Sequence, residues 1–210
     1  MSRRRFVPNT DKRAETTYPI NDLLANRWSP RAFADRAIPP DVLGSLFEAA
    51  RWAPSSRNLQ PWRFVIADRH RDPNGFARIL STLMGANKSW GKNASLLLIA
   101  VTEPKPENVL GGNTYAYYDV GQAMAHLSIQ AMSSGLYIHQ MGGFNREKAR
   151  ELLEIPDQYE PVVSAAIGYL ADPSILSDTM RERELAPRSR HPLSEQVFSA
   201  KWGQAHPDYV

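Results

Sequence analysis

Hydrophobic positions follow helical spacing in some segments of the chain and form short continuous runs in others. Leu43, Leu46, Phe47 and Ala50 repeat at the spacing of one helix face, and Pro54 ends that pattern. The predicted helices cover residues 23–26, 39–53, 76–83, 119–134, 145–153 and 179–185. The predicted strands cover residues 62–67, 95–102, 136–141 and 162–170.

Helices and strands alternate along this part of the sequence. Taken by itself, the alternation predicts a parallel α/β sheet. Residues 95–102 are apolar and bounded by polar residues, which indicates a central strand. Residues 103–114 contain two prolines and a Gly-Gly pair, and we expect a loop there that acts as a mobile lid.

The two ends of the chain differ from its middle. Residues 1–18 are polar and charged, which predicts a flexible arm, so residues 19–210 are expected to form one domain. The last forty residues hold no long apolar element. Leu193, Phe198 and Trp202 are nevertheless too apolar for a free tail, and we expect this tail to wrap around a partner.

Composition excludes several kinds of chemistry. The 210 residues include no cysteine, so disulfides, thiolate nucleophiles and cysteine-ligated metals are excluded, and any redox chemistry needs a cofactor. The histidines show no metal-ligand spacing. No apolar run reaches the roughly 18 residues of a membrane span. No apolar stretch follows the basic residues 3–5, so we expect a cytoplasmic protein without a secretory signal, a membrane partner or a nucleic-acid partner.

Arg27, Ser29 and Arg31 form the first candidate site. Alternate residues of an extended segment point the same way, so two guanidiniums and a hydroxyl would converge. Arginine binds phosphate bidentately and keeps its charge at any working pH. An exposed basic loop with surface ion pairs explains so short a pattern at least as well.

The segment from Pro54 to Trp62 is a second candidate. Two prolines preset its backbone, and its hydroxyls and amides suit the edge of a pyrimidine-like ring better than charged groups would. The alternative is a polar turn with Trp62 packed in the core. The candidate binding residues here are Pro54, Ser55, Ser56 and Asn58.

Two further segments extend this set. Arg188 and Arg190 could complete a phosphate clamp with Arg27, or they could belong to a solvated tail. The glycines of Met141-Gly142-Gly143 would let backbone N–H groups approach a planar ligand, unless this is an ordinary strand-to-helix turn.

We interpret three acidic residues as having structural rather than catalytic roles. Asp119 precedes a long helical pattern and is interpreted as a helix cap rather than an acid catalyst. Glu182 and Glu184 are interpreted as part of a solvated helix face.

Taken in order, these segments resemble the FMN-dependent nitroreductase family from about Leu23 to Trp202. Gly142 departs from the family pattern, because many members carry an acid there. The matching segments are Arg27-x-Ser29-x-Arg31-x-Phe33, Pro54-Ser55-Ser56-x-Asn58-x-Gln60-Pro61-Trp62, Met141-Gly142-Gly143-Phe144 and Arg188-x-Arg190-x-Pro192-Leu193.

The resemblance implies an α+β fold with a mostly antiparallel sheet flanked by helices. It also implies a homodimer that exchanges C-terminal tails and binds two FMN molecules at its interface. One subunit would supply Arg27, Ser29, Arg31, Arg188 and Arg190, and the other Pro54, Ser55, Ser56 and Asn58. The resemblance adds Trp28, Met141, Gly142 and Gly143 to the residues expected to bind FMN.

The implied activity is reduction of FMN by NAD(P)H, followed by reduction of a nitroaromatic, quinone or related small acceptor. No catalytic side chain is implied, and Arg31 would tune the flavin from the N1–O2 edge of its ring. A non-redox FMN storage protein, or another flavin reaction such as reductive dehalogenation, are the alternatives.

Overall fold

Strand β2 (Leu96–Thr102) forms the centre of the protein, and all seven of its residues are buried. The computed structural model describes residues 12–107 and 109–209. Successive strand residues point to opposite faces. Leu96, Leu98 and Ala100 therefore pack into one hydrophobic core, and the residues between them pack into another. A strand that is buried throughout and apolar from Leu96 to Val101 thus requires cover on both faces.

The sheet has the strand order β1-β2-β4-β3, with β1 (Trp62–Asp68), β3 (Tyr137–Met141) and β4 (Glu160–Gly168) around β2. All three strand pairs are antiparallel. The parallel sheet predicted from the alternation of elements is therefore wrong. A continuous apolar run reports burial of both faces, and an antiparallel strand with helices on both sides meets that condition equally well.

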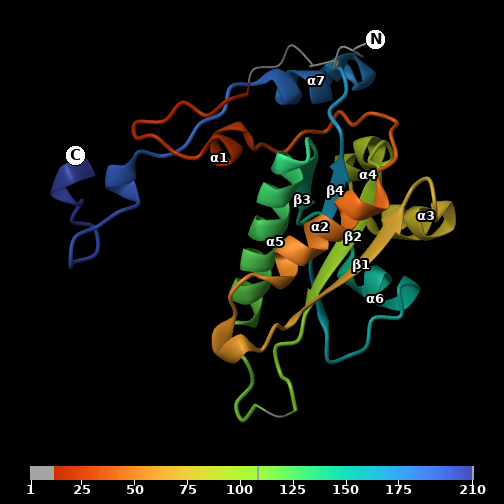
Figure 1. Ribbon diagram of the computed structural model, residues 1–210, viewed down its shortest axis with the longest axis horizontal. Coiled ribbons are helices and arrows are strands. Elements are labelled where there is room, and N and C mark those ends of the chain that lie inside the picture. Colours follow the sequence, from red (N-terminus) through yellow and green to blue (C-terminus); the bar gives the residue numbers. More distant parts are fainter. Residues whose placement is uncertain (1–11, 108, 210) are drawn as a thin grey trace.

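Two layers of helix cover the sheet (Figure 1). Helices α2 (Pro40–Arg51) and α5 (Ala116–Ser133) pack on one core. Helices α3 (Pro73–Thr82), α4 (Ala86–Gly91) and α6 (Arg146–Leu152) pack on the other. Asn145 accepts a hydrogen bond from the Lys148 N–H and caps α6, as its sequence position predicts.

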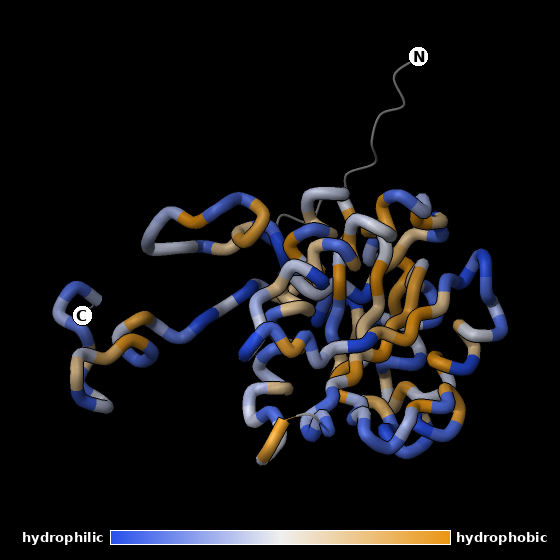
Figure 2. Tube along the Cα trace, turned by 60° about the horizontal axis from the view of Figure 1, so that its bottom comes forward, coloured by the Kyte–Doolittle hydropathy of each residue, from blue (hydrophilic) through white to orange (hydrophobic). Residues whose placement is uncertain are grey.

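The first described residues lie against α1, whereas the C-terminal segment leaves the body of the protein (Figure 2). Residues 1–11 of the predicted arm lie outside the described residues. Residues 12–18 run against α1 (Asp22–Asn26), where the Ala14 N–H donates to the Ala25 carbonyl. After α7 (Asp178–Leu185), the chain leaves the body of the protein, and its last residues extend away from it (Figure 2).

The C-terminal segment forms a small hairpin. Phe198 and Ala205 form an antiparallel bridge, and the Phe198 and Trp202 rings pack edge to face. The Tyr18 hydroxyl donates to the Asp208 carbonyl, which ties the segment to the chain before α1. In the described part of the chain, no helix is both long and apolar enough to cross a bilayer.

Truncating a side chain at the centre of β2 should destabilise the folded protein. Leu98 has no exposed surface, so Leu98→Ala is expected to lower the free energy of unfolding by about 2–5 kcal/mol through lost burial and a residual cavity. Leu110→Ala is the control because Leu110 is fully exposed. Urea unfolding measures both changes. Equal effects of the two substitutions would contradict the central role of β2.

Candidate functional site

The segment from Arg27 to Arg31 follows α1 and lies along β3. The Trp28 ring is 9% exposed and packs edge-on against the Tyr137 ring of β3, with the Lys12 ammonium over it. Ser29 is exposed and Pro30 is buried. The segment is therefore anchored by Trp28 and Pro30, and Ser29 between them is left exposed.

Three arginines predicted to hold a phosphate line one cavity of about 500 Å³. Arg27 comes from the end of α1, and Arg188 and Arg190 come from the segment after α7. Thr16 and Thr17 also line the cavity, as does the exposed carboxylate of Glu15. The structure thus brings together cationic residues that are more than 160 positions apart in the chain.

The guanidiniums in this cavity perturb one another. Burial, and then the neighbouring Arg190 charge, lower the pKa of Arg27 from its ordinary value. Burial, followed by the charges of Arg27 and Arg190, lowers the pKa of Arg188. Arg27 and Arg188 nevertheless stay protonated, because arginine does not lose its proton in proteins. No salt bridge joins any of the three to a carboxylate among the described residues, so the cavity suits an anion.

Arg31 lies outside this cavity and pairs with Glu184 of α7. Its Nη1 atom is 3.5 Å from Glu184 Oε2, and its backbone N–H donates to both carboxylate oxygens at 2.8 and 3.0 Å. Glu184 is only 1% exposed. Its interpretation as part of a solvated helix face is therefore wrong, because the Arg31 guanidinium and the N–H groups of Arg31 and Ala32 satisfy its charge inside the protein.

His139 of β3 holds the same segment from another side. Its Nδ1 atom lies 2.9 Å from the Pro30 carbonyl oxygen, and its ring packs on Trp90 with ring centroids 4.5 Å apart. Because a carbonyl only accepts, Nδ1 carries the proton. Burial lowers the pKa of His139 to about 4, so the ring is neutral near pH 7.

The predicted ring-binding segment forms a tight turn over residues 56–58. Arg57, Asn58 and Gln60 all have positive φ, between 48° and 56°, which non-glycine residues seldom adopt. The Gln60 N–H donates to the Ser55 hydroxyl at 3.1 Å and closes the turn. The Asn58 side chain is left exposed. Such a turn presents its polar groups in one fixed arrangement.

Asp119 supports this turn from α5. Its carboxylate accepts the Ser56 N–H at 3.2 and 3.3 Å and the Asn113 amide at 3.3 Å. Tyr115 occupies the N-cap position of α5, so the interpretation of Asp119 as a helix cap is wrong. The buried carboxylate instead joins the ring-binding turn to the predicted lid at residues 103–114.

The turn after β3 is open on one side. A Cβ atom added at Gly142 would meet nothing within 4 Å, whereas one at Gly143 would lie 2.9 Å from the Asn87 amide nitrogen. The Asn87 amide donates to the Gly143 carbonyl at 3.2 Å. Neither glycine has a positive φ. Gly142 therefore leaves exposed backbone that a flat ligand can approach.

Within one chain, the predicted site is divided. Residues 54–60 precede β1 at one edge of the sheet, whereas Met141 ends β3 at the opposite edge. In Figure 1 the turn of residues 56–58 lies at the lower end of α5, and α1 with the arginine segment lies at the upper end. The structure thus brings Arg27, Arg188 and Arg190 together but does not bring Ser55, Ser56 and Asn58 to them.

Comparison with known proteins identifies the fold. The nitroreductase family model matches residues 24–89 and 76–169. A solved structure described as an oxidoreductase containing FMN superposes with a TM-score of 0.85 at 36% identity, over 94% of this chain and 100% of that one. These matches show a member of a nitroreductase-like α+β fold class.

Several relatives were also found by sequence. An uncharacterized 15.4 kDa protein of Mycolicibacterium smegmatis is 34% identical over 59% of this chain and 82% of its own length. A putative NADH dehydrogenase/NAD(P)H nitroreductase of Archaeoglobus fulgidus is 28% identical over 71% of this chain and 84% of its own. The chain belongs to the nitroreductase family, and the predicted family and antiparallel α+β fold are confirmed.

Sequence reasoning missed three residues that position the site, namely Asp119, His139 and Glu184. Glu184 and Asp119 are nearly as buried as the core leucines, but buried carboxylates have no sequence pattern that separates them from surface ones. For Glu184, the one available signal was its position four residues before Arg188.

The buried neutral His139 should make stability depend on pH. The unfolded histidine takes up a proton near pH 6.5 and the folded one only near pH 4, so stability falls as the pH drops through this window. The slope is at most about 1.4 kcal/mol per pH unit. Urea unfolding of wild type and His139→Asn at about pH 7 and about pH 5 should show a smaller loss in the variant. Parallel curves would contradict a buried neutral histidine.

Proposed function

We propose that this protein is an FMN-dependent oxidoreductase that uses NAD(P)H to reduce a nitroaromatic, quinone or related small acceptor. Membership of the nitroreductase family supports this reading. So do the names of two similar proteins, an oxidoreductase containing FMN and a putative NAD(P)H nitroreductase. The single observation that carries it is the cavity with three arginines and no carboxylate bonded to them among the described residues.

The residues of the chain fit FMN. Arg27, Arg188 and Arg190 would hold the phosphate, because fixed guanidiniums match its charge and geometry. The exposed Ser29, two residues after Arg27, would add a hydroxyl. The open backbone at Gly142 and Gly143 would lie along the ring. Ser55, Ser56 and Asn58 would contact the polar ring edge, and Pro54 and Asp119 keep their turn in shape. Trp28 packs against Tyr137 and supports the arginine segment from behind.

When bound, FMN would supply the redox chemistry, taking a hydride from NAD(P)H and passing electrons to the acceptor. Arg31 would hold a positive charge near the part of the ring that becomes more negative on reduction. The protein would therefore act by binding and orientation, and no side chain needs to serve as acid, base or nucleophile.

A second copy of the chain would complete this site. The turn at residues 56–58 lies far from the arginine cavity in the same chain, so another chain has to supply it. A homodimer also gives the C-terminal segment a partner. Trp202 is 89% exposed, which is unfavourable for an indole in water.

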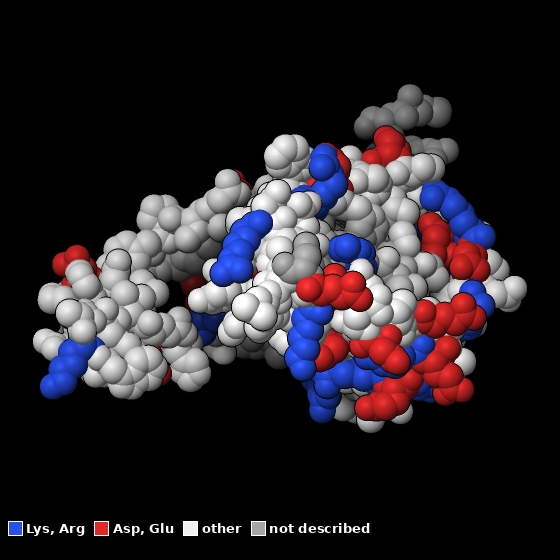
Figure 3. Space-filling view, turned by 90° about the horizontal axis from the view of Figure 1, so that it is seen from below, with Lys and Arg blue, Asp and Glu red and all other residues white. Residues whose placement is uncertain are grey.

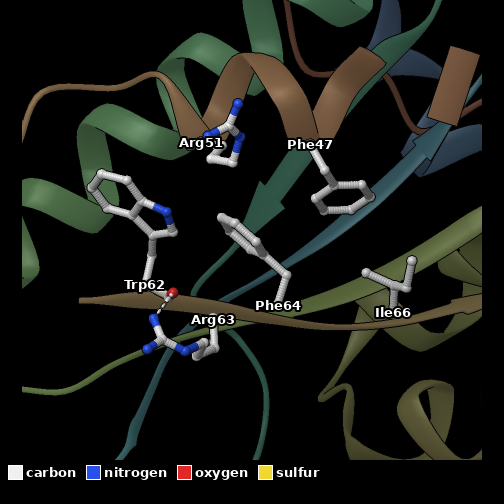
Figure 4. Close-up of a pocket in the computed structure, with 6 residues that line it drawn as sticks. All are labelled: Phe47, Arg51, Trp62, Arg63, Phe64 and Ile66. Atoms are coloured by element: carbon white, nitrogen blue, oxygen red, sulfur yellow. Dashed lines mark hydrogen bonds between the residues drawn. The ribbon is translucent and has the colours of Figure 1, made fainter. Parts of the chain in front are cut away.

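The outer edge of β1 offers the place for that segment. Phe47 and Arg51 of α2 face Trp62, Phe64 and Ile66 of β1 across a groove of about 300 Å³ (Figure 4). As an edge strand, β1 presents one row of its backbone groups to an added strand. We propose that the C-terminal tail of a second copy, with Phe198 and Trp202, fills this groove and so exchanges between subunits.

The face of the protein seen from below (Figure 3) offers no extended basic stripe for a nucleic-acid partner. On the face seen in Figure 3, acidic and basic side chains lie intermixed around the start of β4. A hollow of about 490 Å³ on this protein is lined by Arg146, Arg150, Asp157 and Glu160 together. A phosphate backbone is instead tracked by an extended basic stripe.

FMN binding by the purified protein tests the proposed function. Wild-type protein should bind FMN and lose the flavin absorbance when NAD(P)H is added without oxygen. Arg27→Ala is expected to weaken FMN binding about tenfold, because it removes one charge-assisted phosphate contact. Equilibrium dialysis gives the affinity, and Arg78→Ala on the exposed surface of α3 is the control. Bound FMN that NAD(P)H never reduces would indicate the storage function instead.

The oligomeric state tests tail exchange. Ile66 is 37% exposed in the β1 groove and Trp202 is almost fully exposed, so Ile66→Asp and Trp202→Asp should each shift the dimer toward monomer. Leu110→Asp, at a fully exposed position, should leave the dimer intact. Sedimentation velocity measures all three. A wild-type monomer, or variants that remain dimeric at every concentration, would refute the exchange.

A further inference from the structure

One peptide unit in the arginine segment is held at both of its polar ends. The C=O of Pro30 and the N–H of Arg31 belong to the same planar peptide. His139 Nδ1 lies 2.9 Å from that carbonyl oxygen, and the N–H donates to Glu184 at 2.8 and 3.0 Å. The two side chains come from β3 and α7, which are distant in sequence.

Glu184 also holds the residues around this peptide. The Ala32 N–H donates to Glu184 Oε1 at 3.1 Å, and the Arg31 guanidinium lies 3.5 Å from Oε2. One carboxylate therefore fixes both the backbone and the side chain of Arg31. The carboxylate is almost fully buried, so water cannot take over these bonds without a rearrangement.

The rest of the segment is anchored by backbone bonds. Downstream, the Ala171 N–H donates to the Ala32 carbonyl, and Phe33 and Leu170 form an antiparallel bridge. Upstream, the Arg27 N–H closes the last turn of α1. Between these anchors, the peptide joining residues 30 and 31 has no backbone partner among residues 12–107 and 109–209, so within this part of the chain His139 and Glu184 set its direction.

We propose that His139 and Glu184 are positioning residues, which clamp the peptide between Pro30 and Arg31 and thereby direct Ser29 and Arg31 toward the flavin. This proposal rests on the FMN function proposed above. Without this clamp, the long Arg31 side chain could adopt several rotamers. A fixed backbone direction removes most of that rotamer freedom. We call this arrangement the peptide clamp.

His139 allows a test that changes no charge near pH 7, because its ring is neutral there. His139→Phe keeps an aromatic ring against Trp90 but removes the donor to Pro30. His139→Asn keeps an N–H close to the Nδ1 position. A loss seen in the first variant and rescued in the second therefore reports the hydrogen bond rather than packing.

FMN affinity and the midpoint potential of bound FMN are the two readouts. His139→Phe is expected to weaken FMN binding about tenfold and to lower the potential, in the same direction as Arg31→Ala, because the Arg31 cation moves away from the ring. His139→Asn should stay within about twofold of wild-type affinity and keep the wild-type potential. Wild-type affinity and potential in His139→Phe would overturn the proposal.

Hydrogen exchange tests the clamp without FMN. In the ligand-free protein, Glu184→Gln should speed exchange of the Arg31 and Ala32 amides at least about tenfold, because the charged acceptor of both is lost. Glu182→Gln on the exposed side of α7 is the matched control. Unchanged exchange in Glu184→Gln would overturn the clamp even if wild type binds FMN. Failure of wild type to bind FMN would refute the proposed function while leaving this measurement valid.

Discussion

Burial of β2 on both faces is the constraint from which the rest of the structure follows. Every residue of this strand is apolar or small, so each face of the sheet has to be covered by helices. The covering helices in turn fix where the loops emerge. The arginine segment emerges at one end of the sandwich and the strained turn of residues 56–58 at the other.

The charged residues of the arginine cavity and those around Arg31 are arranged in different ways. In the cavity, three guanidiniums gather without a bonded carboxylate, which leaves a positive field for an anion. At Arg31, the buried Glu184 carboxylate pairs with the guanidinium and accepts hydrogen bonds from the N–H groups of Arg31 and Ala32. The first arrangement suits binding from solvent. The second suits rigidity, because a buried ion pair that loses one partner leaves an uncompensated charge.

Much of the fold could be predicted from local sequence patterns. The helical spacing of Leu43, Leu46 and Ala50 and the apolar run of β2 both correspond to observed elements. The direction of the strands could not be predicted this way, because periodicity records which faces are buried and carries no information on pairing. It was the family resemblance that supplied the antiparallel sheet.

The sequence alone determined which residue types were available for binding, including Arg27, Arg188 and the amide-rich turn before β1. Only the tertiary structure decided that Arg27 and Arg188 line the same cavity. It also decided that the Ser56 N–H donates to the Asp119 carboxylate and that Glu184 is buried against Arg31. The physical reason is that burial of a polar side chain depends on partners brought from distant segments. Local patterns record hydrophobicity and spacing, whereas hydrogen-bond satisfaction is a property of the folded chain.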